Sequence, residues 1–275
     1  MKLNILHRSH VGRVRELNED AYAIWRPPAS SDADCALLAI ADGMGGHPGG
    51  EIASRLAVEA VEKMAPTLVG KFPSELLTSS FQFASHQIKE RATAEPEYGE
   101  MGTTLTCVWY QDGHAYVGHV GDTRLYWFRE DRWVQVTVDH TMAQDLVDAG
   151  RLEPEEADEH PTSHVLTRCL GVCPRQSPDI LHGSLALQDG DTLLLATDGL
   201  GKTVHDETLA EMIGKVGPEQ ACDWMIEAAL AAGAPDNVTV ILARAEGDAP
   251  FAPAYGGPKH QLDGSPARFS WDFGI

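Results

Sequence analysis

Residues 35–46 read CALLAIADGMGG, and residues 191–199 read DTLLLATDG. Each segment is a short apolar run that ends in Asp-Gly, which is typical of a buried β-strand that stops at a sharp turn. The glycine allows a tight turn and leaves room for the backbone to approach a ligand. Because functional residues concentrate where loops leave a rigid sheet, Asp42 and Asp198 become candidate site residues.

Further strands are predicted around these two segments. Residues 3–7, 103–110 and 114–121 are short apolar runs flanked by Gly or Asp turn signals. The short turn Gln111-Asp112-Gly113 joins the last two runs, so at least part of the sheet is antiparallel.

Four segments have a helical pattern. From Ile52 to Met64, apolar residues recur at helical spacing opposite charged residues, which predicts a helix that covers a sheet face. Other helices are predicted near 74–94, 206–213 and 218–232. Strands with helices added on the outside indicate an α+β fold in which stacked sheets are flanked by helix pairs.

Composition limits the classes of function. The chain has 275 residues, 43% of them apolar, which suffices for one substantial core. A formal charge of −20 argues against binding a nucleic-acid backbone. No stretch approaches the ~18 apolar residues of a membrane span, and the first residues do not resemble a signal peptide. We therefore expect a cytoplasmic protein without a membrane span.

The cysteines are expected to be reduced. They are odd in number, widely spread and without a C-x-x-C pair, which argues against a disulfide framework. They are Cys35, Cys107, Cys169, Cys173 and Cys222. Cys169 and Cys173, flanked by His164 and His182, come closest to a zinc pattern, but buried structural thiols are the preferred interpretation.

Four aspartates lie at chain reversals and together indicate a metal site. They are Asp20, Asp42, Asp198 and Asp236. One Asp-Gly alone would be read as a turn. Carboxylates held close together repel one another unless a cation lies between them, and oxygen ligands favour Mg²⁺ or Mn²⁺ over Zn²⁺. Two such ions, bridged by one carboxylate, suit the displacement of a phosphoryl group by water.

A fixed cation for phosphate is also present. Arg15 lies on the same segment as Asp20. Its guanidinium matches phosphate geometry, although a surface arginine without a function is the alternative.

The order of short motifs resembles that of the metal-dependent protein phosphatases, also called type 2C serine/threonine phosphatases. The motifs are Gly12-Arg13-Val14-Arg15, Asn18-Glu19-Asp20, Asp42-Gly43-Met44-Gly45-Gly46, Gly102-Thr103-Thr104, Gly121-Asp122-Thr123-Arg124, Asp139-His140, Leu166-Thr167-Arg168, Thr197-Asp198-Gly199 and Asp236-Asn237-Val238-Thr239. The resemblance covers about residues 5 to 245. It implies an α+β fold, a four-layer αββα sandwich of two mainly antiparallel sheets flanked by helix pairs, with the metals in a cleft at one edge.

The resemblance also implies roles for individual residues. Asp42 corresponds to the carboxylate that bridges two Mn²⁺ or Mg²⁺ ions, and Gly43 to a ligand through its backbone carbonyl. Asp198 and Asp236 correspond to the other ligands of the first ion. Arg15 corresponds to the phosphate-binding arginine.

Other positions match the periphery of the family's site. Glu19 and Asp20 correspond to carboxylates that hold metal-bound waters. Asp122, with Asp198, corresponds to a third metal site of bacterial members, although an aspartate that stabilises a turn beside Arg124 is the alternative. Residues 141–165 fall where the family carries a mobile flap.

The general acid and the chain end are less defined. Some members have a histidine after Asp-Gly, but this chain has Met44, so no general acid is assigned; His47 has an equally good interpretation as a turn residue. The acidic run 153–160 is expected to be a solvated loop or helix start. Residues 1–245 are the expected catalytic domain, and 246–275 a Pro/Gly-rich tail.

The expected function is hydrolysis of phosphoserine and phosphothreonine in proteins by a metal-activated water. The resemblance implies phosphoprotein substrates, an opposing bacterial serine/threonine kinase and a link to type VI secretion, and we expect a monomer. Two alternatives are considered. Ala196–Thr203 nearly matches a nucleotide-binding loop, but Asp198 would point a negative charge at the phosphates. An inactive binding module is the other, but the carboxylates that catalysis requires are all present.

Overall fold

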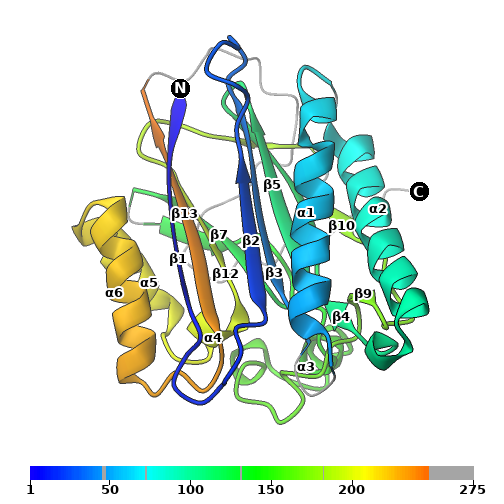
Figure 1. Cartoon of the computed structure of the whole chain (residues 1–275). Helices are drawn as coiled ribbons and strands as arrows, with labels where there is room; N and C mark the ends of the chain where they lie inside the picture. Colours follow the sequence, from blue (N-terminus) through cyan, green and yellow to red (C-terminus); the bar gives the residue numbers. More distant parts are fainter. Residues whose placement is uncertain (45–47, 72, 131, 182, 248–275) are drawn as a thin grey trace.

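The fold is a sandwich of two antiparallel sheets between two layers of helices (Figure 1). The computed structural model describes residues 1–44, 48–71, 73–130, 132–181 and 183–247. This arrangement confirms the predicted four-layer α+β fold.

Each sheet combines strands that are distant in sequence. The first sheet has the order β1 (Lys2–His10), β13 (Val238–Glu246), β12 (Thr192–Ala196), β7 (Arg124–Arg129) and β8 (Arg132–Gln135). The second has the order β10 (Asp179–Ile180), β6 (His114–Val120), β5 (Leu105–Gln111), β3 (Cys35–Asp42) and β2 (Asp20–Trp25), and β11 (Leu185–Ala186) also pairs with β6. A small separate pair consists of β4 (Gly102–Thr103) and β9 (Leu170–Gly171).

The helices form the outer layers. The second sheet is covered by α1 (Gly50–Leu68) and α2 (Pro73–Ala94), and the first by α5 (Asp206–Lys215) and α6 (Pro218–Ala231). All four confirm the predicted helices. Shorter helices are α3 (Met142–Asp148), α4 (Asp198–Gly201) and the 3₁₀ turns Pro96–Tyr98 and Pro154–Glu156.

The apolar run of β3 follows from its place in the sandwich. Leu37 packs toward the helices, whereas Leu38 and Ile40 pack toward the other sheet, and all three are fully buried. A strand covered on both faces needs apolar residues at successive positions. Truncation of one of these side chains to alanine would cost about 2–5 kcal/mol.

Two predicted strands end earlier or later than expected. The run 103–110 is divided into β4, which pairs with β9, and β5, which pairs with β3 and β6. The run 191–198 ends at Ala196, and Asp198 begins α4. At the other end of the domain, β13 continues to Glu246. The rest of the predicted tail, residues 248–275, lies outside the described residues.

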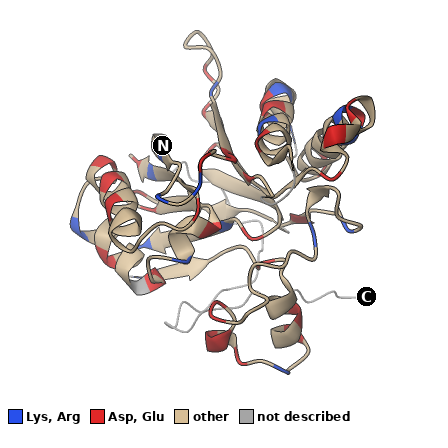
Figure 2. Ribbon diagram, turned by 60° about the horizontal axis from the view of Figure 1, so that its bottom comes forward, with Lys and Arg blue, Asp and Glu red and all other residues tan. Residues whose placement is uncertain are grey.

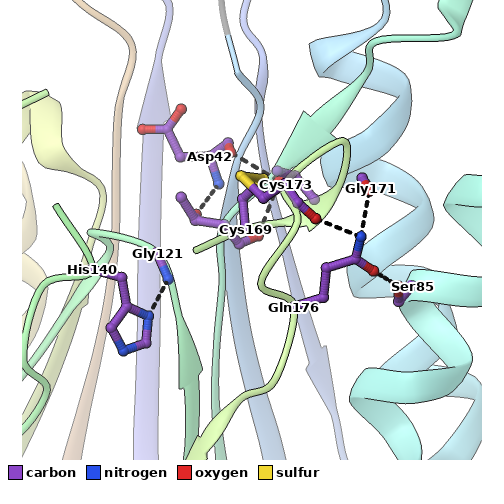
Figure 3. The surroundings of a disulfide bond; sticks show 10 residues. Asp42, Ser85, Gly121, His140, Cys169, Gly171, Cys173 and Gln176 are labelled. Carbon is purple, nitrogen blue, oxygen red and sulfur yellow. Dashed lines mark hydrogen bonds between the residues drawn. A yellow bond between two sulfur atoms is a disulfide. The ribbon is translucent and has the colours of Figure 1, made fainter. Parts of the chain in front are cut away.

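The expectation that all cysteines are reduced is wrong for two of them. Cys169 and Cys173 form a disulfide, and their Cα atoms are 5.3 Å apart. The bond closes the turn around β9 (Figure 3). The sequence did not reveal the pairing because it depends on this chain reversal and not on a C-x-x-C spacing. The bridge closes only a short loop, so its stabilisation is about 2 kcal/mol. Cys35, Cys107 and Cys222 are free and buried, as predicted.

No helix in the described ranges is long and apolar enough to cross a membrane.

Candidate active site

Most acidic residues lie on the outer helices and loops, but a small group gathers at one end of the sandwich (Figure 2). Asp20 begins β2 and Asp42 ends β3, and the two are paired across the antiparallel ladder. Asp198 follows β12, and Asp236 precedes β13. Because β12 and β13 are neighbours, the two sheets each contribute a pair of carboxylates to the same end. The structure thus brings together the four aspartates singled out in the sequence.

The backbone of Asp42 is held from both sides. Its N–H donates to Thr104 Oγ1 (2.8 Å), and its carbonyl accepts from Thr104 N (2.9 Å) and Thr103 Oγ1 (2.8 Å). Gly43 N donates to the Glu19 carbonyl at 3.1 Å. A Cβ atom at Gly43 would lie 2.3 Å from the carbonyl oxygen of Gly50, so only glycine fits here. The motif Gly-Thr-Thr therefore orients the central carboxylate.

Asp20 links the two sheets. Its Oδ2 accepts hydrogen bonds from Thr197 Oγ1 (2.9 Å) and Thr239 Oγ1 (2.6 Å), which belong to the first sheet's end. Its Oδ1 is buried without a hydrogen-bond partner, and so is Asp198 Oδ1. Buried carboxylate oxygens without a partner are costly, so each favours a bound cation.

Asn237 attaches the N-terminal loop to this end of the sandwich. Its Oδ1 accepts from Glu19 N (2.8 Å), and its Nδ2 donates to the carbonyls of Val11 (2.9 Å) and Leu17 (3.0 Å). This loop carries Arg15. The sequence placed Asn237 in a motif, but its role depends on contacts across the whole chain and was not foreseen.

Two cationic side chains converge on one carboxylate oxygen. Arg15 donates through Nη2 to Asp236 Oδ2 at 3.0 Å. Lys202 Nζ lies 3.5 Å from the same oxygen and also forms an ion pair with Asp198. As the side chains stand, no three histidine, cysteine or acidic residues in the described part of the chain lie close enough together to hold one ion. Asp198 and Asp236 are paired with these cations instead.

The carboxylates disfavour one another's charge. Burial raises the pKa of Asp42 well above its usual value, and the charges of Asp198 and Asp20 raise it further. Burial also raises the pKa of Asp20 to about 7, against the effect of its two threonine hydrogen bonds. For Asp122, burial is again the main cause of a raised pKa, followed by Asp198. Such a group is stabilised by cations, and its all-oxygen donors suit Mg²⁺ or Mn²⁺.

His140 holds the backbone of Gly121, the residue before Asp122. His140 Nδ1 accepts from the N–H of Gly121 (3.0 Å), and His140 N donates to the Gly121 carbonyl (2.7 Å) (Figure 3). His140 Nε2 lies 2.9 Å from Asp179 Oδ2, so the neutral ring donates to this carboxylate. The Asp139-His140 motif thus supports the turn that carries Asp122, whose exposed fraction is 8%.

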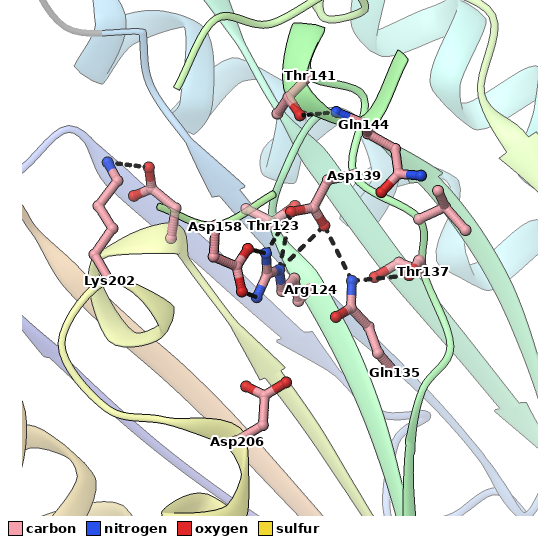
Figure 4. Close-up of polar contacts among 12 residues, drawn as sticks. Thr123, Arg124, Gln135, Thr137, Asp139, Thr141, Gln144, Asp158, Lys202 and Asp206 are labelled. Atoms are coloured by element: carbon pink, nitrogen blue, oxygen red, sulfur yellow. Dashed lines mark hydrogen bonds and ion pairs between the residues drawn. The ribbon is translucent and has the colours of Figure 1, made fainter. Parts of the chain in front are cut away.

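The turn interpretation placed Asp122 beside Arg124, but the ion pairs of Arg124 are with two other aspartates. Arg124 bonds both oxygens of Asp139, at 2.7 to 3.1 Å, and forms an ion pair with Asp158 (Figure 4). Asp158 belongs to the segment predicted as a flap. The acidic run 153–160 contains a 3₁₀ turn, Pro154–Glu156. The ion pair therefore ties this segment to β7.

No general acid was assigned from the sequence, and the segment 196–203 was judged not to be a nucleotide-binding loop. His47 lies outside the described residues, and Met44 offers no proton. Thr203 Oγ1 donates to the carbonyls of Gly199 (2.8 Å) and Leu200 (3.0 Å), and Lys202 pairs with Asp198. Both neighbours of β12 are antiparallel. The structure agrees with the rejection of a nucleotide-binding loop.

A two-sheet sandwich with clustered carboxylates at one end has the architecture expected for type 2C phosphatases. The family model described as "Protein phosphatase 2C" matches residues 8–231. The chain belongs to this family.

Two relatives illustrate the similarity. The serine/threonine protein phosphatase PstP of Mycobacterium tuberculosis is 36% identical over 86% of this chain, which spans 44% of that protein's length. The serine/threonine phosphatase stp of Listeria innocua is 31% identical, with 86% of this chain and 93% of that protein covered.

Solved structures agree with the observed fold. The catalytic domain of PstP in complex with two manganese ions has a TM-score of 0.77 and 34% identity, covering 89% of this chain and 99% of that one. PppA of Pseudomonas aeruginosa, described as a key regulatory component of T6SS, has a TM-score of 0.73 and 28% identity. The match covers 89% of this chain and 98% of that one.

Proposed function

We propose that this chain hydrolyses phosphoserine and phosphothreonine in proteins with the aid of two divalent ions, Mn²⁺ or Mg²⁺. The carboxylate cluster carries the proposal, because two of its buried oxygens have no hydrogen-bond partner and its members raise one another's pKa. The manganese-bound structure of PstP, which is similar over 89% of this chain, supports the choice of metal.

The proposed metal ligands come from both sheets. Asp42 would contact both ions and Gly43 would contribute its carbonyl, while Asp198 and Asp236 would hold the first ion. When bound, the ions would supply an activated water and positive charge for the phosphoryl oxygens. Threonine contacts fix the backbone of Asp42 and the carboxylate of Asp20 before substrate arrives.

The remaining residues would act around this centre. Arg15 would bind the substrate phosphate, since its guanidinium lies at the rim and already contacts Asp236. Glu19 and Asp20 would hold waters by hydrogen bonds. Asp122 would act beside Asp198. The segment 141–165, tied down by Asp158, would lie over the substrate.

Removal of divalent ions tests the proposal. Hydrolysis of a phosphoserine or phosphothreonine peptide is expected with Mn²⁺ or Mg²⁺ and should stop in excess EDTA. Release of phosphate is the measurement, and re-addition of Mn²⁺ should restore it. Undiminished turnover in EDTA would remove the metal hypothesis, and absence of turnover under all conditions would favour a binding module.

Replacement of Arg15 tests the phosphate-binding role separately. Arg15→Ala should raise KM about 10-fold or more, because a charged hydrogen bond to the phosphate is lost. The factor by which kcat falls should be no larger than the factor by which KM rises. Arg13→Ala is a matched control on the same loop, since Arg13 donates instead to the Leu230 carbonyl. Equal constants for Arg15→Ala and the wild type would contradict the assignment.

The cellular role is a further part of the proposal. We place the catalytic domain at 1–245, and we propose a cytoplasmic monomer that opposes a bacterial serine/threonine kinase. Similarity to PppA supports a link to type VI secretion. A kinase gene next to this gene, whose substrates gain phosphate when the phosphatase is deleted, is the expected observation.

A further inference from the structure

The Cys169–Cys173 disulfide encloses the whole of β9. Leu170 and Gly171, the two residues of this strand, lie between the cysteines in sequence. A two-residue strand pair has little stability of its own, so β9 depends on the groups that hold its turn. Besides the disulfide, Gln176 holds it: Nε2 donates to the carbonyls of Gly171 (2.6 Å) and Cys173 (2.7 Å) (Figure 3).

The same turn is connected to Asp42 through β4. Gly102 and Thr103 of β4 pair with β9 in antiparallel register. Thr103 Oγ1 donates to the Asp42 carbonyl at 2.8 Å, and Met44 N donates to the Gly102 carbonyl at 2.9 Å. The packing is tight, since a Cβ atom at Gly102 would lie 3.1 Å from the Leu170 carbonyl oxygen. β4 thus joins the disulfide turn to the backbone at Asp42, and Figure 3 draws both ends of this path.

The position of the bond favours a role beyond the stability of the whole fold. Its cysteines are four positions apart, so it constrains the unfolded chain over a short loop only. Disulfides in cytoplasmic proteins are usually transient and catalytic or redox-sensing, and the cytoplasm is the proposed location of this chain. The bond also lies near the surface: Cys169 is fully buried, but Cys173 is 7% exposed and follows Val172, which is 44% exposed.

We propose that the Cys169–Cys173 disulfide positions Asp42 through β9 and β4, and that its reduction to two thiols lowers phosphatase activity. The inference rests on the proposed function. A dithiol reductant would give two electrons and two protons to the two sulfurs and would itself become a disulfide. Hydrogen peroxide would take them back and form two molecules of water. In the reduced form the turn opens more often, and the hydrogen bonds of β4 to residues 42 and 44 weaken with it.

A count of thiols tests whether the bond forms and breaks in solution. The chain has five cysteines, of which three are free and buried, so the oxidised protein should show three thiols after denaturation. Dithiothreitol should raise the count to five, and hydrogen peroxide should return it to three. A count that stays at five in hydrogen peroxide would overturn the inference.

Amide hydrogen exchange tests the coupling to Asp42 without metal or substrate. In ion-free buffer, dithiothreitol should speed exchange of the Thr104 and Met44 N–H groups about 10-fold or more, because they donate to carbonyls on this path. The Thr197 N–H, which donates to the Thr239 carbonyl in the other sheet, is the control and should not change. Unaltered exchange at Thr104 and Met44 would overturn the inference. So would unfolding of the whole protein on reduction, because the bond would then hold the fold and not one turn.

Turnover and metal binding test the consequence for the site. Reduction should lower kcat about 3- to 10-fold and weaken Mn²⁺ binding, because Asp42 is displaced, whereas KM for a phosphopeptide should change little, because the loop of Arg15 is not. The double variant Cys169→Ala/Cys173→Ala should have the kcat of the reduced protein with or without dithiothreitol. Cys222→Ala is the matched control: it removes a buried cysteine that forms no disulfide and should keep the response of the wild type.

The outcomes separate the inference from the proposed function. Equal kcat and equal Mn²⁺ affinity before and after reduction would overturn the inference, although phosphopeptide turnover itself would support the proposed function. A wild type that hydrolyses no phosphopeptide in either state, but whose Thr104 and Met44 amides exchange faster after reduction, would contradict the proposed function and leave the coupling of the disulfide to Asp42 intact.

Discussion

Replacement of Asp42 by asparagine is expected to lower kcat by ~10²-fold or more, with a folded protein retained. Asp42 is proposed to contact both ions, and an amide cannot neutralise them. Loss of about 3 kcal/mol of transition-state stabilisation corresponds to a fall of this size. The amide would keep the backbone contacts of residue 42 with Thr103 and Thr104, since these involve only main-chain atoms of Asp42.

The stability of the same variant distinguishes a functional carboxylate from a structural one. Burial and the neighbouring carboxylates raise the pKa of Asp42, so its ionised form is disfavoured in the folded chain. Asp42→Asn should therefore melt at the same temperature as the wild type or higher in ion-free buffer, and Mn²⁺ should stabilise it less. A matched control is Asp112→Asn, in an exposed turn with φ of 50° that asparagine also tolerates. Wild-type kcat for Asp42→Asn, with a normal Mn²⁺ titration, would contradict the bridging role.

The sequence predicted the elements well where the hydrophobic pattern was strong. The strand 35–42 has the predicted bounds, and the helix predicted near 218–232 ends at Ala231. The convergence of Asp42 and Asp198 was foreseen because both end apolar runs that a sandwich must bury. The layer order and the individual metal roles came from the family resemblance and not from periodicity.

The remaining features depend on contacts between distant segments. Asn237 binds the backbone of residues 11–19 because β1 pairs with β13 at the opposite end of the chain. A local sequence pattern does not predict which distant strands pair. Lys202 matched a local phosphate-loop motif, but antiparallel neighbours of β12 place it beside Asp198 and Asp236. The disulfide is local in sequence, but it forms only because the turn at β9 brings Cys169 and Cys173 together.

Gly199 shows how closely α4, which follows β12, must approach the start of β13 to form the site. A Cβ atom at this position would lie 1.9 Å from the carbonyl oxygen of Asn237, far inside van der Waals contact. Since the clashing atom belongs to the backbone, no rotation of a side chain can relieve it. Gly199→Ala must therefore separate α4 from the start of β13, which moves Asp198 away from Asp236.

We expect Gly199→Ala to cost about 1–3 kcal/mol of folding free energy and to lower kcat ~10²-fold, because a shift of about 1 Å at reacting groups has this effect. Urea denaturation and phosphopeptide turnover per folded molecule measure the two effects separately. Gly214→Ala is the matched control: Gly214 lies in α5 with open space around it, so alanine there should leave turnover unchanged and stabilise the helix by about 0.5–1 kcal/mol. If Gly199→Ala keeps both the stability and the turnover of the wild type, the close approach of α4 and β13 is not what positions the two carboxylates.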